Sequence, residues 1–543
     1  MFVHNSQNPS NRTLSSCSNW PINLTQSVRN PCVTSFGGNA ISHEKETNIR
    51  RNLSTIYSDG TRKTYVQACT SRPQPTLSVT KIPGFKNSPI HGERELRNLL
   101  WGNSVKEDVF KRWAQGFYFS RDEPTALVQT EGGPCAVIAP VQAYILKQLL
   151  MEGEPDTWSP VDTHKQDRLL VRAATEIIGQ AANQDKSAYR IVHLELPTTA
   201  TTTTGGTAKM EEQENPLENG QVSDEPGVKA MDACLKQNFL CEGRKINGKS
   251  IFRILTTESL DEVERYLTER IGTLKEPFGV LLLLYTVVCT KGISGMRAEM
   301  SDPTEPIIDS TYGYGSQSLI NLMLTGRAVG HVWDHDQDVG GLKLRGIDKQ
   351  NAVGFLALLE HLRYCEVGAF LKSPSHPVWV LGSETHLTVL FSTDRRLVSP
   401  ETPAEQARRV FKKFDPEGNN FISADLLQDV LEELGLCADT EYVNIMRKKL
   451  DSECLGIILL AGFMDEFFPE EPRTCPDTFP LYHYNGLPRS NPENSVKYHV
   501  GQSVLLECNV KCILDSNPML TVLQTKWPSI EIQWDTGRTP SLN

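Results

Sequence analysis

A single cysteine stands where a helix is expected to begin, directly after a tight turn. The segment 129–146 reads Gln-Thr-Glu-Gly-Gly-Pro-Cys-Ala-Val-Ile-Ala-Pro-Val-Gln-Ala-Tyr-Ile-Leu, with Cys135 after Gly-Gly-Pro. The first turn of a helix presents unpaired N–H groups and a partial positive charge, which lower the pKa of a thiol. The same N–H groups can bind the oxyanion formed when a carbonyl is attacked. Cys135 is therefore a candidate nucleophile, and the simpler alternative is a small buried side chain.

Two further residues could complete a site for acyl transfer. Gln129 lies six residues before Cys135, where its amide can add a donor to the oxyanion hole, as in papain-like cysteine proteases. A cysteine nucleophile also needs a base. His386 opens the strand-like run Leu-Thr-Val-Leu-Phe after a glycine turn, so it can face a cleft from a rigid strand end.

The alternatives for the base and its partner stay open at this point. His386 could equally be a satisfied structural histidine. A third residue that orients His386 is expected, but no downstream Asn or Asp is singled out by the sequence. Asp394 is a candidate, although a role in a surface turn fits it better.

A buried helix has to hold the cysteine in place. Ile138, Val141, Ile145 and Leu149 follow Cys135 at helical spacing, which predicts a buried helix with Cys135 at its exposed end. Pro140 interrupts this pattern. Because proline removes an N–H and clashes with the preceding turn, either the first turns are kinked or the regular helix starts after Cys135.

Several long motifs, in order, resemble the MINDY deubiquitinases, specifically their EF-hand-bearing branch. The resemblance runs from about residue 95 to residue 543. The motifs are Arg-Trp-Ala-Gln-Gly-Phe at 112–117, Glu-Gly-Gly-Pro-Cys at 131–135, Gly-Ser-Gln-Ser-Leu-Ile-Asn-Leu at 315–322, Gly-Ser-Glu-Thr-His-Leu-Thr-Val at 382–389, Tyr-His-Tyr-Asn-Gly at 482–486, Gln-Thr-Lys-Trp-Pro at 524–528 and Ser-Leu-Asn at 541–543.

This resemblance implies a function and a set of site residues. In that family the cysteine is the nucleophile, the histidine its general base and the upstream glutamine an oxyanion-hole donor, roles that would fall to Cys135, His386 and Gln129. The implied reaction is hydrolysis of isopeptide bonds in polyubiquitin, with a preference for lysine-48-linked chains. Polyubiquitin and ubiquitinated proteins are the implied partners, and the nucleus joins the cytoplasm as an expected location.

Other functions remain compatible with the sequence. A catalytically silent ubiquitin-binding adaptor would keep the same fold, although the intact set of Gln129, Cys135 and His386 argues against it. A cysteine peptidase for another ubiquitin-like modifier is a closer rival, because no ubiquitin-contact residue can be read from the sequence. A calcium-regulated scaffold is a third alternative.

Composition excludes several classes of protein. The chain has 543 residues and a net charge of -11, which argues against a nucleic-acid-binding groove. Its thirteen cysteines are an odd number without tight pairs, as expected for free thiols in a reducing compartment without a bound metal. The longest apolar run, 278–289, is too short to span a bilayer and is predicted to be a buried central strand.

Four regions are expected along an α+β chain with papain-like active-site logic. Residues 1–92 are rich in Ser, Asn, Thr and Pro, with no acidic residue before Glu44, and are predicted to be disordered. A catalytic domain follows at 93–401. It carries a threonine-rich and then acidic insert at 198–227, which is also predicted to be disordered.

A helical module at 402–469 is expected to be an inserted, degenerate EF-hand pair. Its first loop starts at Asp415 with the spacing of calcium ligands, but position twelve is Leu426 instead of glutamate, so tight calcium binding is not expected. Ile422 and Ile458 occupy the loop position at which paired EF-hands bridge through short strands. The module is therefore predicted to serve packing or the binding of a protein partner. Strands at 470–543 are expected to complete the catalytic domain.

One motif suggests a different chemistry. Gly-Arg-Lys-Ile-Asn-Gly-Lys-Ser at 243–250 matches the phosphate-binding P-loop pattern. A P-loop should open a helix, whereas Ile251–Thr257 is typical of a strand and a helix is expected only after Ser259. Nucleotide binding is therefore not predicted, and no cofactor is expected.

Overall fold

The protein is described by a computed structural model that covers part of the chain. The described residues are 84–88, 92–153, 161–182, 188–194, 236, 239–240, 252–399, 402–415, 418–469, 475–506 and 517–543. They belong to one compact unit. Residues 1–83 of the expected N-terminal extension, the insert at 198–227 and the P-loop-like pattern at 243–250 lie outside them.

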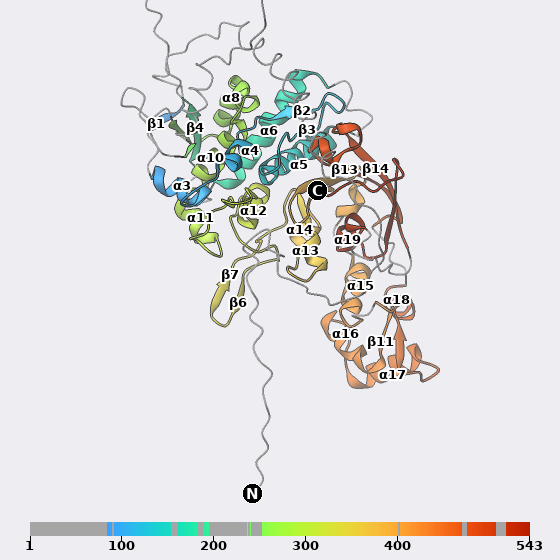
Figure 1. The fold of residues 1–543 in the computed structure, drawn as a ribbon. Coiled ribbons are helices and arrows are strands. Elements are labelled where there is room, and N and C mark those ends of the chain that lie inside the picture. Colours follow the sequence, from blue (N-terminus) through green and yellow to red (C-terminus); the bar gives the residue numbers. More distant parts are fainter. Residues whose placement is uncertain are drawn as a thin grey trace, which may run out of the picture. The chain divides into compact units, whose positions relative to one another are not determined.

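Helices dominate the first half of the described chain, with short strands between them (Figure 1). In order these elements are β1 (Lys86–Ser88), α3 (Glu93–Trp101), α4 (Glu107–Trp113), β2 (Tyr118–Phe119), β3 (Leu127–Val128), α5 (Cys135–Glu152), α6 (Thr163–Ala181), β4 (Tyr189–Leu194), β5 (Phe252–Thr257), α8 (Leu260–Glu269), α9 (Ile271–Lys275), α10 (Gly279–Lys291), α11 (Ile293–Glu299) and α12 (Gln317–Thr325).

The second half supplies most of the strands. Its elements are β6 (Gln337–Val339), β7 (Leu342–Leu344), β8 (Gly354–Ala357), α13 (Leu358–His361), α14 (Ala369–Lys372), β9 (Val378–Gly382), β10 (Leu387–Phe391), α15 (Pro403–Lys413), β11 (Phe421–Ser423), α16 (Leu427–Glu433), α17 (Thr440–Leu450), β12 (Ile457–Leu459), α18 (Leu460–Phe467), β13 (Thr478–Tyr484), β14 (Tyr498–Leu505), α19 (Pro518–Gln524) and β15 (Ile530–Trp534), besides short 3-10 turns. The mixture of helix and sheet agrees with the expected α+β class.

A helix replaces the strand expected at residues 278–289. This apolar run forms α10, in which every residue except Cys289 is buried. An element that is apolar on all sides has no periodicity, so a strand and a buried helix cannot be told apart by pattern. The length of the run favours a helix, because buried strands seldom exceed eight residues. The sequence prediction was therefore wrong here.

The segment after the P-loop-like pattern is a strand, as predicted. Residues Phe252–Thr257 form β5, the middle strand of a three-stranded sheet with the order β1-β5-β4. The helix α8 begins only after Ser259, whose side chain accepts a hydrogen bond from the Glu262 N–H as an N-cap. No helix therefore follows directly on residue 250, where a P-loop would need one.

The largest sheet has six strands in the order β15-β14-β13-β10-β9-β8. All neighbours are antiparallel except β8 and β9. Strands β10 and β13 are adjacent in space although the α15–α18 segment separates them in sequence. The residues just before β10, near 386, and just after β13, near 485, therefore lie next to each other at the same end of this strand pair.

Both faces of the six-stranded sheet are covered. Trp379, Leu381 and Leu390 point to one face and pack in a cluster with Val522 and Leu523 of α19. Because side chains alternate along a strand, the intervening residues face the other side, where α5 packs on β9 and β10. All five residues of β10 are buried, which makes this strand a rigid support between two layers.

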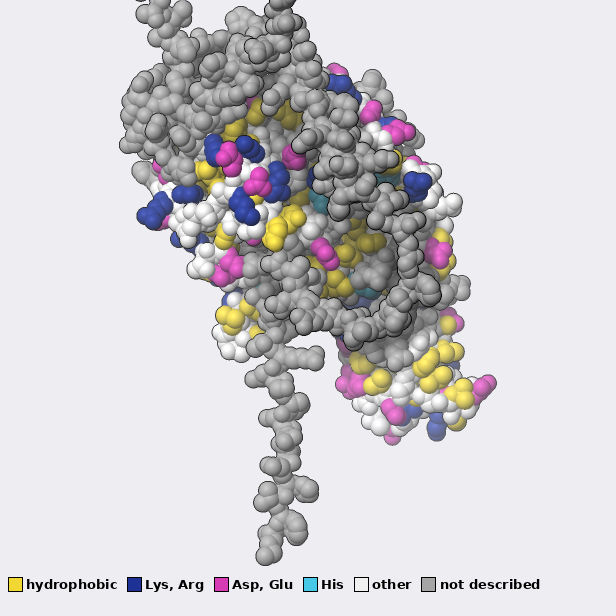
Figure 2. Space-filling model, viewed as in Figure 1, with side chains coloured by type: hydrophobic (Ala, Val, Ile, Leu, Met, Phe, Trp, Pro, Cys, Tyr) yellow, Lys and Arg dark blue, Asp and Glu magenta, His cyan; other side chains and the backbone are white. Residues whose placement is uncertain are grey.

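The 402–469 segment forms a helical module with its own core, built from α15, α16, α17 and α18. Thr402 and Glu405 form a capping box at the start of α15. Strands β11 and β12 pair, with Ile422 opposite Ile458. Figure 2 shows apolar side chains on the surface of the molecule, and four exposed ones belong to this module: Phe421, Ile445, Leu455 and Leu459.

Among the described residues, no single helix is both long and apolar enough to cross a membrane. The pair α10 and α11 meets the length and composition only when the two are taken together, and the chain bends by 80° between them.

The burial of α10 gives a first prediction. Leu281→Ala should lower the free energy of unfolding by about 2–5 kcal/mol, because it leaves a cavity in a packed helix interface. Leu342→Ala, at a position that is 64% exposed in β7, should change it by less than about 0.5 kcal/mol. Chemical denaturation of both variants measures the difference, and equal values would contradict the packing of α10.

Candidate active site

Cys135 is the first residue of α5, directly after Pro134. The helix is regular from this point, because Val137 N and Ile138 N both donate to the Pro134 carbonyl. Pro140 is accommodated inside it, so the helix does not start later. The prediction that this end of the helix is exposed was wrong, because Cys135 is only 4% exposed.

The loop before Cys135 is held by side chains of the preceding helix and turn. Gln115 Oε1 accepts from Thr130 N at 2.9 Å, and Gln115 Nε2 donates to the Glu131 carbonyl at 3.0 Å. Arg112 Nη1 donates to the Gly132 carbonyl. These bonds fix the backbone of residues 130–132, which sets where Cys135 and its helix begin.

Gln129 lies between this loop and the six-stranded sheet. Its backbone N–H donates to the Gly486 carbonyl at 2.8 Å, and its Nε2 donates to the Glu131 carbonyl at 2.9 Å. The side chain is 2% exposed. The amide group of Gln129 is thus engaged within the same loop that leads to Cys135.

His386 occupies the turn between β9 and β10. Its backbone N–H donates to Ser383 Oγ at 3.0 Å, and its carbonyl accepts from Ser383 N. The backbone N–H of the next residue, Leu387, lowers the pKa of the Cys135 thiol, and β10 packs against α5. The structure therefore brings the start of β10 against the start of α5, and with it two of the predicted site residues.

Asn485 is the residue that binds the ring of His386, and sequence reasoning did not identify it. His386 Nε2 and Asn485 Oδ1 are 3.1 Å apart, and both side chains are buried. Asn485 follows the last residue of β13, next to the start of β10. Its motif at 482–486 was visible in the sequence, but only the register between β10 and β13 reveals its partner.

The bonds of Asn485 determine the tautomer of His386. Oδ1 accepts from Leu487 N at 3.0 Å, while Nδ2 donates to the Ser541 carbonyl at 3.0 Å. A backbone N–H can only donate and a carbonyl can only accept, so the amide has one orientation. Asn485 therefore presents an acceptor to His386, whose Nε2 must carry the proton. Nδ1 is left with the lone pair that a general base needs.

The cysteine helix and the asparagine strand share a further contact at Leu127. Gln142 Oε1 of α5 accepts from Leu127 N at 2.7 Å, and Tyr484 Oη of β13 donates to the Leu127 carbonyl at 2.6 Å. Both side chains are buried. These two bonds hold β3 between α5 and β13, and they thereby position Gln129, the residue that follows β3.

Burial dominates the electrostatics of the site. It raises the pKa of the Cys135 thiol to about 11, although hydrogen bonds from Leu387 N and Ala136 N act in the opposite direction. Burial also lowers the pKa of His386 to about 4, against the hydrogen bond of Asn485 and with the positive charge of Arg489. The thiol and the imidazole are therefore both neutral at pH 7. The expected lowering of the thiol pKa by the helix start is outweighed by desolvation.

A loop before α12 lies beside the start of α5. A methyl group at Gly315 would lie 2.4 Å from Ala136 Cβ, and one at Gly133 would lie 3.5 Å from the Gly313 carbonyl. The segment 313–315 thus packs along residues 133–136. Tyr314 lies between these glycines, and its pKa is raised first by burial and, to a lesser extent, by the interaction with Cys135, which agrees with the position of this segment beside the start of α5.

Asp394 takes the turn role that the sequence favoured for it. It caps the 3-10 turn at Arg395–Val398 and forms an ion pair with Arg396 at 2.6 Å. The ring of His386 is bound by Asn485 instead.

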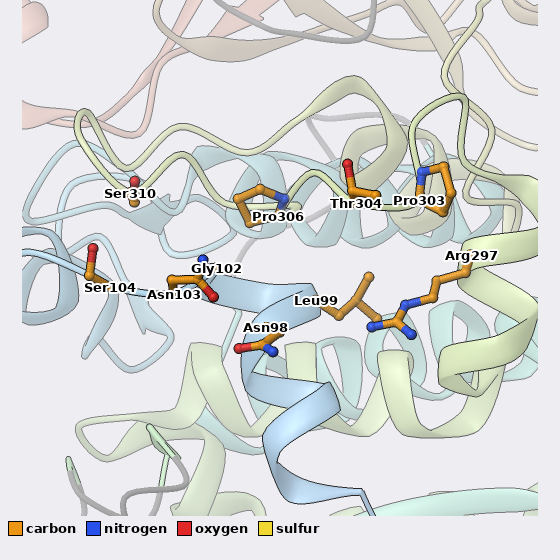
Figure 3. A pocket seen from close by; sticks show the side chains of 10 residues that line it. All are labelled: Asn98, Leu99, Gly102, Asn103, Ser104, Arg297, Pro303, Thr304, Pro306 and Ser310. Atoms are coloured by element: carbon orange, nitrogen blue, oxygen red, sulfur yellow. The ribbon is translucent and has the colours of Figure 1, made fainter.

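One cavity lies elsewhere, between the end of α3, α11 and the loop at 303–310 (Figure 3). It has a volume of about 700 Å³, and its mixed lining includes the polar side chains of Asn98 and Arg297. Gln129, Cys135 and His386 are not among its lining residues. Within the described part of the chain, no group of three or more His, Cys, Asp or Glu side chains could hold a metal ion.

Comparison with known proteins identifies the family. A family model described as "Deubiquitinating enzyme MINDY-3/4, conserved domain" matches residues 97–412. The chain is 51% identical over 480 residues to "Ubiquitin carboxyl-terminal hydrolase MINDY-3 homolog" of Drosophila melanogaster, covering 85% of each protein. It is 44% identical over 457 residues to human "Ubiquitin carboxyl-terminal hydrolase MINDY-3", covering 83% of this chain and 99% of the relative.

A more distant relative extends the comparison. Human "Probable ubiquitin carboxyl-terminal hydrolase MINDY-4" is 28% identical over 397 residues, which cover 68% of this chain and 46% of the relative. No solved structure matches significantly. The matches define a hydrolase of the cysteine-peptidase type. The chain belongs to the MINDY-3/4 family of deubiquitinating enzymes.

The raised pKa of Cys135 predicts how its alkylation depends on pH. Because the thiolate is a small fraction below a pKa of about 11, the rate of its reaction with iodoacetamide should rise about tenfold per pH unit between pH 7 and 10. Peptide mass spectrometry of the native enzyme measures this rate, with exposed Cys437 as a control for the reagent. A rate that is already constant from pH 7 would instead indicate a standing thiolate.

Proposed function

We propose that this deubiquitinase acts through Cys135 as nucleophile, His386 as general base and Gln129 as a donor to the oxyanion, with papain-like logic. The observation that carries this proposal is the single orientation of the Asn485 amide, which leaves His386 Nδ1 as a proton acceptor in the turn before β10, the strand on which α5 packs. Asn485 is the orienting residue.

The reaction proceeds in two steps. The Cys135 sulfur attacks the carbonyl carbon of ubiquitin's terminal glycine while its proton passes to His386 Nδ1, and the oxyanion is stabilised by Gln129 and backbone N–H groups. His386 then gives its proton to the departing lysine amine, and a thioester remains. Water attacks the thioester, with His386 again taking a proton, and the thiol is regenerated. Since both groups are neutral at rest, the proton moves together with the attack.

Polyubiquitin and ubiquitinated proteins are the proposed substrates, with lysine-48-linked chains preferred. The support for this substrate class is the family, whose relatives are named as ubiquitin carboxyl-terminal hydrolases. The linkage preference rests on the sequence resemblance. The nucleus is a proposed location on the same ground, in addition to the cytoplasm as the default.

We also propose that the chain belongs to the EF-hand-bearing branch and that its 402–469 module is a degenerate EF-hand pair, which keeps its form without calcium. Asp415, at the first position of its loop, accepts hydrogen bonds from Asn419 N and Asn420 N, and Asp451 accepts from Leu455 N and Gly456 N. Both carboxylates thus brace their own loops. The exposed apolar side chains of the module suit a protein partner.

The domain limits of the catalytic region belong to the same proposal. Residues 93–401 and 470–543 would form one catalytic domain, because β10 pairs with β13 across the intervening module. Residues 1–92 would be an extension outside it.

Substitution of the three site residues tests the mechanism. Cys135→Ala should abolish the shortening of lysine-48-linked ubiquitin tetramers, because no thioester can form. Gln129→Ala should lower kcat by about 10²- to 10³-fold, as expected for the loss of one oxyanion donor. Gel analysis with tetramers of each linkage measures this, and Cys437→Ala, at an exposed cysteine, is the matched control.

The outcomes separate the alternatives. Cleavage of another linkage alone would overturn the proposed preference, while a fully active Cys135→Ala variant would overturn the nucleophile. If the folded, unmutated protein cleaves no linkage, labelling of Cys135 by electrophiles made from ubiquitin or from other modifiers decides between a different substrate and a silent adaptor.

Asn485 gives a further prediction. Asn485→Ala removes the acceptor of His386 Nε2–H, so kcat should fall by about 10- to 100-fold with KM nearly unchanged. Steady-state kinetics with a fluorogenic ubiquitin amide measure both constants. A rise in KM at constant kcat would show that Asn485 serves binding instead.

A further inference from the structure

The orientation of Asn485 depends on a segment far away in the sequence. Its backbone is fixed locally, because Asn491 Nδ2 donates to the carbonyls of both Asn485 and Leu487 at 2.8 Å. Its side-chain oxygen is held by Leu487 N. The acceptor for its side-chain nitrogen, however, is the carbonyl of Ser541, 56 residues later, at 3.0 Å.

The same segment also holds the turn that carries His386. Asn543 Oδ1 accepts hydrogen bonds from Ser383 Oγ at 2.5 Å and from Thr385 Oγ1 at 3.1 Å. Ser383 Oγ in turn accepts from His386 N. One side chain therefore ties together the turn immediately before the histidine.

Leu542 anchors the segment between these two contacts. It is 5% exposed and packs in the core cluster beneath the six-stranded sheet, together with Trp379 of β9 and Trp534 of β15. Ser541 Oγ donates to the Asn543 carbonyl at 2.6 Å and accepts from Asn543 N, which closes a tight turn around Leu542. Ser541 and Asn543 consequently project toward the site from a fixed position.

We propose that Ser541–Asn543 is a positioning element of the active site, which keeps the Asn485 amide and the His386 turn in the catalytically competent arrangement. This inference rests on the catalytic role proposed for His386. The segment contributes no group to the reaction. It acts through Asn485 and through Ser383, and thereby fixes which nitrogen of His386 carries the proton.

The physical consequence of losing the segment follows from the amide. Without the Ser541 carbonyl, Asn485 Nδ2 has lost its acceptor, and rotation of the amide would turn this donor toward His386. A donor at that place favours the imidazole tautomer with its proton on Nδ1. That tautomer cannot accept the proton of Cys135. Leu487 N still favours the original orientation of the amide. Only part of the molecules should therefore adopt the unproductive tautomer, and the loss of activity should be partial.

Two variants of the full enzyme test the proposal. A chain that ends at Pro540 should lose about 10- to 100-fold in kcat, less than the roughly 10⁴-fold cost of a fully wrong tautomer in a Ser-His-Asp site, with KM within about twofold. Asn543→Ala keeps Leu542 in the core and removes only the acceptor of Ser383 and Thr385. It should lower kcat by about 3- to 10-fold. The control is Arg538→Ala, at an exposed position three residues before Ser541.

Two readouts distinguish positioning from a general loss of stability. The nitrogen-15 resonances of the His386 ring, assigned with His386→Gln, should shift in the shortened chain toward the tautomer protonated at Nδ1. In a double-mutant cycle, shortening the chain in the Asn485→Ala background should lower kcat by no more than the roughly 3- to 10-fold expected for Asn543→Ala, because the amide that Ser541 orients is already gone. The thermal unfolding midpoint of each variant shows whether the variant is folded and how stable it is.

The experiments distinguish a failure of the positioning proposal from a failure of the proposed catalytic residues. If Cys135→Ala is inactive while the folded, shortened chain keeps its kcat and its His386 tautomer, the positioning role is wrong and the assignment stands. Full additivity in the cycle would also overturn the positioning role. If the shortened chain fails to fold, Asn543→Ala decides: an unchanged kcat would contradict the proposal. An active Cys135→Ala variant would instead remove the assignment on which it rests.

Discussion

The hydrogen bond between His386 Nε2 and Asn485 Oδ1 is the interaction on which the site depends. It joins two strands that are neighbours in the sheet but separated by the whole 402–469 module. A neutral, buried imidazole has two tautomers of similar energy, and only a partner of fixed polarity selects one. The amide of Asn485 has that fixed polarity because a backbone N–H and a backbone carbonyl bind its two ends. These two hydrogen bonds keep the amide from turning.

Burial has two effects in this site. It withdraws the thiol and the imidazole from water, which leaves both uncharged and protects the cysteine from unwanted chemistry. It also makes each neighbouring hydrogen bond stronger and each error of geometry more costly. The rigid, doubly covered strand β10 and the braced loop before α5 are therefore needed together.

The sequence predicted the family, the enzyme class and the α+β character, and these are confirmed. The order of the motifs along the chain predicted the family. The positions of Cys135 and His386 could be predicted from local pattern, because both residues lie at the start of a helix or strand. The roles of Cys135, His386 and Gln129 stay predictions. Two features could not be read from local pattern. The run at 278–289 was taken for a strand because an all-apolar segment has no period, and Asn485 was missed because its partner is set by strand register over 99 residues.

The order of these parts along the chain has a consequence for synthesis. The thiol lies at residue 135, the imidazole at 386, its amide partner at 485 and the carbonyl that orients this amide at 541. A growing chain thus carries its nucleophile candidate long before the partner of the base exists. Full protease activity would be reached only when the late strand β13 has docked beside β10, so that a nascent chain would become fully active only near the end of its synthesis.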